Sequence, residues 1–109
     1  MKIIGKGWYT GPRNYNTGAG FGITTRKDDR DKYFKREWNS VILRLEGIEG
    51  DVIVNINKPS FWSKCPELIK KEIGIFFKIK GVINWRKGYP PKVELEQIKD
   101  NIFIVRLLK

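Results

Sequence analysis

Basic and aromatic side chains are interleaved in two separate segments of the chain. The first segment, residues 6–26, contains Lys6, Trp8, Tyr9, Arg13, Tyr15 and Arg26. The second segment, residues 85–92, contains Trp85, Arg86, Lys87, Tyr89 and Lys92. Lysine and arginine neutralise phosphates, and aromatic rings stack on unpaired bases, so this mixture is typical of surfaces that bind single-stranded nucleic acid. We predict that these side chains bind nucleic acid.

Residues that commonly carry catalysis are scarce. Histidine is absent, and Cys65 is the only cysteine. This excludes Ser-His and Cys-His pairs and a cysteine-rich zinc site. The sequence therefore predicts no catalytic residue, no cofactor and no metal site, and it favours a binding protein over an enzyme.

An acidic cluster keeps a small nuclease open as an alternative. Asp28, Asp29 and Asp31 lie close together, and two-metal nucleases use carboxylates of this kind. Three basic residues interleave with them, and acidic residues also favour the first turn of a helix. We interpret the cluster as a helix N-terminus. A metal-independent ribonuclease of the toxin or mobile-element type, using Arg, Lys and Tyr, also stays open.

The stretch "TGAGFG", residues 17–22, places glycine at every second position. It lacks the Gly-Lys-Ser/Thr ending of a phosphate-binding loop. In a strand, Gly18, Gly20 and Gly22 would leave one face bare, while Phe21 and Ile23 fill the other and enter the core. The bare face predicts either a ligand platform or a tight bend of a small barrel.

The positive charge is concentrated in two parts of the chain. The net charge is +10, from 22 basic and 12 acidic residues. Residues 1–38 carry +5 and residues 59–92 carry +6, whereas residues 39–58 and 93–109 carry −1 and zero. A domain this basic attracts polyanions. Nucleic acid is the expected partner, and an acidic protein partner is a further alternative.

Length and apolar patterning predict a single domain, residues 1–109, located in the cytoplasm. A chain of 109 residues matches one domain. A lone cysteine fits a reducing compartment. The N-terminus has no signal-peptide pattern, and no apolar run is long enough to span a membrane, so no membrane association is expected. The oligomeric state is left open.

Hydrophobic periodicity predicts an α+β domain that is mainly β. Alternation predicts hairpins over 40–46 and 51–57 and over 92–98 and 102–108, a strand in "FGITTR", and a short edge strand at 2–4. Helical spacing of Leu68, Ile69, Ile73, Phe76 and Phe77 predicts an amphipathic helix at about 64–80. A short helix is predicted at about 29–38, with Tyr33, Phe34 and Trp38 facing inward.

The element order suggests a small five-stranded antiparallel barrel or half-barrel. One helix lies between the third and fourth of five strands, and this order resembles that of an OB-fold. The "KDN" connection is shorter than the binding loop that OB-folds often have there, and an extra helix follows the first strand. An SH3-like or PUA-like barrel is therefore the alternative. Trp38 and Trp62 are predicted to pack on the core, and Trp8 and Trp85 are equally consistent with core and with exposed loops.

Overall fold

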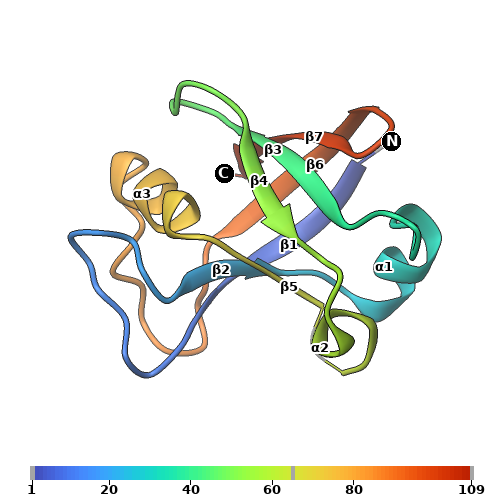
Figure 1. The fold of residues 1–109 in the computed structure, drawn as a ribbon. Coiled ribbons are helices and arrows are strands. Elements are labelled where there is room, and N and C mark those ends of the chain that lie inside the picture. The colour runs from blue at the N-terminus through green and yellow to red at the C-terminus, as the bar shows by residue number, and fades with distance from the viewer. Residues whose placement is uncertain (1, 65, 109) are drawn as a thin grey trace.

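The chain folds into a strongly curved sheet of seven strands that nearly closes into a barrel (Figure 1). The computed structural model describes residues 2–64 and 66–108. The strands are β1 (Lys2–Tyr9), β2 (Phe21–Thr24), β3 (Ser40–Leu45), β4 (Val52–Asn55), β5 (Glu67–Ile69), β6 (Lys92–Lys99) and β7 (Ile102–Leu107). Their order in the sheet is β4-β3-β7-β6-β1-β2-β5. Neighbouring strands are antiparallel except β3 and β7, which run parallel.

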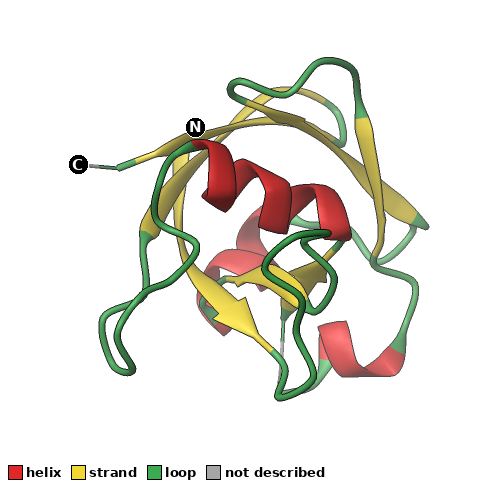
Figure 2. Cartoon of the chain, turned by 90° about the vertical axis from the view of Figure 1, so that its left-hand side faces the viewer, coloured by secondary structure: helices red, strands yellow, loops and turns green. Residues whose placement is uncertain are grey.

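Three short helices cover the ends of the barrel in the described part of the chain. Two of them, α1 (Lys27–Tyr33) and α2 (Pro59–Trp62), lie at one end, and α3 (Lys71–Ile79) lies at the other (Figure 1 and Figure 2). α3 turns Ile73, Phe76 and Phe77 inward, where they are fully buried, because residues three and four apart share one helix face. The terminal strands β4 and β5 contact each other but are not neighbours in the hydrogen-bonded order, so the barrel has a seam there.

The mainly β class and both predicted hairpins are confirmed. β3 and β4 form one antiparallel hairpin, and β6 and β7 form the other. The predicted strand in "FGITTR" is β2. In β3 the inward residues Val41, Leu43 and Leu45 are buried, as their alternation indicates.

The predicted five strands and OB-like order are not confirmed, and the parallel pair β3–β7 departs from the predicted antiparallel barrel. The predicted short edge strand at 2–4 is the start of a longer strand inside the sheet. β1 has eight residues and lies between β6 and β2. The sequence of β1 does not show alternating apolar residues, because Gly5 and Gly7 occupy inward positions. A Cβ at Gly5 would lie 2.6 Å from Ile23 Cγ2, and one at Gly7 would lie 2.9 Å from the Pro91 ring. Neighbouring side chains therefore fill the inner face of β1.

The predicted helix at 64–80 is instead a strand followed by a shorter helix. Residues 67–69 form β5, which pairs with β2, and α3 begins only at Lys71. Leu68 is buried whereas Ile69 is half-buried, as expected for neighbouring residues of a strand. The prediction failed here because the apolar residues of this segment also fit the spacing of a helix. Cys65, which fell within the predicted helix, lies outside the described residues.

The short helix predicted at 29–38 lies earlier in the chain. α1 spans Lys27–Tyr33 and ends at Phe34. The predicted inward packing is confirmed, because Phe34 is buried and Tyr33 and Trp38 pack against the core. Trp62 also packs against it.

The glycine-rich stretch is not a strand with a bare face, and the structure overturns that interpretation. Gly18 and Gly20 lie before β2 with φ of 84° and 86°, a left-handed conformation that favours glycine. Gly18 packs against Gly74 of α3, where a Cβ on Gly74 would overlap the Gly18 Cα and carbonyl oxygen. Gly22 lies in β2, where a Cβ would be 2.5 Å from the Leu68 carbonyl oxygen. Neighbouring backbone covers these glycines, so they offer no platform.

The Gly18–Gly74 contact predicts that Gly74→Ala destabilises the fold. Alanine favours helix by about 1 kcal/mol over glycine, but its methyl group would meet backbone atoms that cannot turn aside. We expect a net loss of about 1–3 kcal/mol in the free energy of unfolding, measured by urea denaturation. Gly11→Ala is the control, since nothing lies within 4 Å of its Cβ position. A Gly74→Ala variant as stable as Gly11→Ala would contradict this packing.

Candidate functional site

The two basic-aromatic segments meet at one end of the barrel. The Gly7 N–H donates a hydrogen bond of 2.8 Å to the Pro91 carbonyl oxygen. The Tyr9 and Trp85 ring centroids are 5.2 Å apart. The two loops that carry these segments run along the same side of the molecule (Figure 1). Folding thus joins residues that are 76 and 84 positions apart in the chain.

Three neighbouring hollows lie on the surface where these segments meet. The first has a volume of about 330 Å³ and is lined by Val82, Asn84, Trp85, Arg86, Tyr89 and Pro91. The second, of about 360 Å³, is lined by Lys6, Gly88, Tyr89, Pro90 and Lys92. The third, of about 340 Å³, is lined by Ile4, Lys6, Thr24, Thr25 and Arg26. Tyr89 is shared by the first and second hollows and Lys6 by the second and third, so the three form a continuous surface, called the hollow series below.

Among the described residues, the charged side chains that line the hollow series are all cations. Lys6 and Lys92 are direct register partners on β1 and β6. Like charges in this arrangement destabilise a sheet. Neither lysine has an ion-pair partner among residues 2–64 and 66–108, and the same holds for Arg26 and Arg86. The fold thus gathers four cations whose charge is left available to a ligand.

Farther along β6 the same outer face is neutralised. Glu94 and Glu96 both accept from Arg106, and Glu94 also pairs with Lys2. The hydrogen bond from Arg106 lowers the pKa of the Glu96 carboxyl. The outer face of β1 and β6 therefore divides into an ion-paired part and the unpaired cationic part at Lys6 and Lys92.

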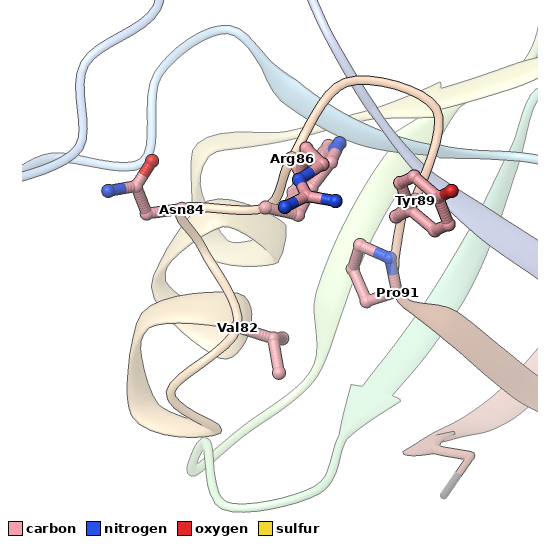
Figure 3. Close-up of a pocket in the computed structure, with 6 residues that line it drawn as sticks. Val82, Asn84, Arg86, Tyr89 and Pro91 are labelled. Carbon is pink, nitrogen blue, oxygen red and sulfur yellow. The ribbon is translucent and has the colours of Figure 1, made fainter.

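Tyr89 lies between the first and second hollows and is mostly exposed. Its exposed fraction is 70%, the largest among the exposed large hydrophobic residues. A tight turn presents it: the Tyr89 N–H bonds to the Arg86 carbonyl oxygen at 2.9 Å, and Gly88 has φ of 89°, which suits the third position of a turn. Arg86 and Tyr89 lie beside each other at the rim of the first hollow, with Pro91 next to the ring (Figure 3). The Arg86 guanidinium carbon is 5.6 Å from the ring centroid.

Trp85 and Tyr9 are structural anchors rather than free stacking surfaces. Both are half-buried and pack against the core. Trp85 contacts Tyr9, Phe21 and Phe77 through ring pairs with centroids 5.2, 5.8 and 5.5 Å apart. Trp85 also lines the first hollow, so it contributes a floor to the site while holding the loop to the core.

Arg13 and Tyr15 are occupied in holding the 10–20 loop. The Arg13 guanidinium carbon lies 3.7 Å from the Tyr9 ring centroid. Its Nε donates to Tyr15 Oη at 3.0 Å, and its Nη1 donates to the Thr10 carbonyl oxygen at 3.3 Å. Tyr15 in turn packs edge-on against Phe21. These contacts explain why neither side chain lines the hollow series.

Six of the predicted binding residues line the hollow series and five do not. The lining residues are Lys6, Arg26, Trp85, Arg86, Tyr89 and Lys92. The others are Trp8, Tyr9, Arg13, Tyr15 and Lys87. Sequence reasoning missed Ile4, Thr24 and Pro91. An alternation with glycine at the inward positions 5 and 7 would have placed Ile4 and Lys6 on one face of β1.

In the acidic cluster, Asp28 and Asp29 lie in the first turn of α1, as predicted, and Asp31 pairs with Arg30. Arg30 is buried and donates to the carbonyl oxygens of Phe61 and Ser63 at 2.9 and 2.7 Å, while its Nε bonds to Asp31. No group of three His, Cys, Asp or Glu side chains in the described part of the chain could hold a metal ion.

No family model, curated protein or solved structure matches the chain. Within the described residues, no helix is long and apolar enough to cross a membrane.

The opposed lysines predict that Lys6→Glu stabilises the fold. An oppositely charged cross-strand pair with Lys92 would replace a like-charged one, a change worth about 0.2–1 kcal/mol. We expect an increase of this size in the free energy of unfolding at low salt, shrinking as salt screens the pair. Lys6→Gln should fall between the wild type and Lys6→Glu. Equal stability of all three proteins at low salt would contradict a repulsion between Lys6 and Lys92.

Glu67 is the register partner of Thr24. We expect its carboxyl group to make the stability of the fold depend on pH. Burial raises the pKa of its carboxyl, and the charge of Lys58 opposes this rise. A raised pKa means that the fold disfavours the carboxylate, so this cost is full above the folded pKa and vanishes below the unfolded value. Glu67→Gln should therefore raise Tm at pH 7 and leave it unchanged near pH 3. The exposed Glu49→Gln variant is the control, and a Tm gain that is larger in acid would reverse the assigned sign.

Proposed function

We propose that this protein binds single-stranded nucleic acid on the hollow series, without catalysing a reaction on it. The observation that carries the proposal is the position of Tyr89, which is 70% exposed, between two hollows whose linings include the unpaired cations Arg86, Lys6 and Lys92. Lys6, Lys92, Arg26 and Arg86 supply charge for phosphates. A base stacking on Tyr89 adds about 1–3 kcal/mol.

Single strands suit this surface better than duplex does. The exposed ring offers a flat apolar face that a paired and stacked base cannot reach. Unpaired bases can splay outward and stack on such a ring. The proposal places the protein in the cytoplasm and covers both DNA and RNA.

If Lys6, Lys92, Arg26 and Arg86 bind phosphates, the affinity for a single strand should depend strongly on salt. This dependence should weaken when lysines of the hollow series are removed. Fluorescence anisotropy with a labelled single strand of about 12 nucleotides should show affinity falling steeply between about 50 and 200 mM salt. The double variant Lys6→Gln/Lys92→Gln should bind more weakly and flatten the log–log salt slope by about 1.4, because each lost contact on a single strand contributes about 0.7.

The matched control for this test is Lys64→Gln/Lys99→Gln. It removes the same net charge from exposed lysines that do not line the hollow series. Equal losses in both double variants would show attraction by net charge alone and would contradict the site. Absence of binding by the wild type at low salt would overturn the proposed function.

The stacking part of the proposal predicts an aromatic requirement at position 89. Tyr89→Leu should weaken single-strand binding by about 5- to 150-fold, the equivalent of 1–3 kcal/mol, whereas Tyr89→Phe should bind like the wild type. The same titration with a duplex and with poly-glutamate separates the alternatives. Equal affinity of all three polyanions, unaffected by Tyr89→Leu, would instead favour an acidic protein partner.

A further inference from the structure

Tyr89 separates an apolar hollow from a cationic one. This difference limits which part of a ligand each hollow can hold. The first hollow is mainly apolar, with Val82, Trp85 and Pro91 in its lining. The second hollow places Lys6 and Lys92 on the other side of the shared tyrosine. The third adds Arg26 and Thr24 to Lys6, whereas the hydroxyl of the buried Thr25 donates to the Pro66 carbonyl oxygen. One hollow thus suits a base, and the next two suit the phosphates that follow it.

Neither the Asn84 amide nor a backbone N–H group of residues 89–91 is placed to identify a base in the first hollow. The Asn84 amide is turned away from Tyr89 and Pro91 (Figure 3). The Tyr89 N–H is already bonded to Arg86, and the prolines at 90 and 91 have no N–H. A base in this hollow would be held by its faces, against the Tyr89 ring and the planar Arg86 guanidinium. Discrimination between bases, in contrast, requires hydrogen bonds to their edges.

The length of the hollow series limits how many nucleotides it can hold. Lys92, Lys6 and Thr24 lie in one row across β6, β1 and β2, and two strand spacings span about 10 Å. Nucleotides in one strand of stacked DNA follow one another about every 3.4 Å along the helix axis, and we take this spacing for the part of the strand beyond the base on Tyr89. This row of two lysines and a threonine therefore accommodates about three nucleotides, with the base on Tyr89 at one end.

We infer that the ligand of this surface is a short single-stranded segment of about three to four nucleotides, bound with little preference among the four bases. This inference rests on the proposed function. In it, Tyr89 and Arg86 stack one base, and Lys6, Lys92 and Arg26 hold the adjoining phosphates.

Competition titrations with unlabelled homo-oligonucleotides of one to about eight nucleotides test the inference. Affinity should rise steeply up to three or four nucleotides and then increase only slightly. The four homopolymers should agree within about fivefold, because edge reading would separate them by more than that. Continued steep gains beyond five nucleotides, or a preference for one base above about fivefold, would overturn it.

Arg86→Lys separates stacking from charge at the first hollow. It keeps the positive charge and removes the planar group, so affinity should fall about fivefold for every homopolymer while the salt slope stays unchanged. Arg44→Lys, at an arginine that pairs with Asp51, is the control. An Arg86→Lys variant that binds like the wild type, or that changes base preference, contradicts stacking at this hollow. If the wild type binds no oligonucleotide, the proposed function itself fails, whereas binding with a longer footprint defeats only this inference.

Discussion

The packing of Trp85 on Tyr9 is the contact on which the candidate site depends. Trp85 also meets Phe21 and Phe77, so the 82–91 loop is anchored to the core between β2 and α3. The bond from Gly7 to Pro91 fixes the same loop to β1. With the base of the loop held at two points, the Gly88 turn can project Tyr89 into solvent without losing its position beside Lys6.

The arrangement of charge gives a physical reason to regard this surface as functional. Elsewhere on the sheet, acidic and basic side chains pair, as Arg106 does with Glu94 and Glu96. At Lys6 and Lys92 the register instead brings two lysines face to face, which costs stability. Sites that bind polyanions commonly retain such unfavourable charge because the ligand neutralises it.

The sequence predicted the mainly β class and both hairpins because alternation of apolar residues marks strands that have one buried face. It failed at β1, where Gly5 and Gly7 take the inward positions, and at β5, where Leu68 and Ile69 fit helical spacing equally well. It predicted Tyr89, Arg86 and Lys92 as binding residues from composition, and these three line the hollow series. It could not separate them from Arg13 and Tyr15, because the guanidinium contact with Tyr9 that occupies Arg13 exists only in the folded protein.

The central claim is that single-stranded nucleic acid binds at the hollow series rather than over the basic surface as a whole. A titration of isotopically labelled protein with a short single strand, followed by amide NMR, tests this most directly. Shifts should concentrate at Lys6, Thr24, Arg26, Arg86, Tyr89 and Lys92 and saturate together. Shifts concentrated at α1 and α2, or spread evenly over the exposed lysines, would contradict the account.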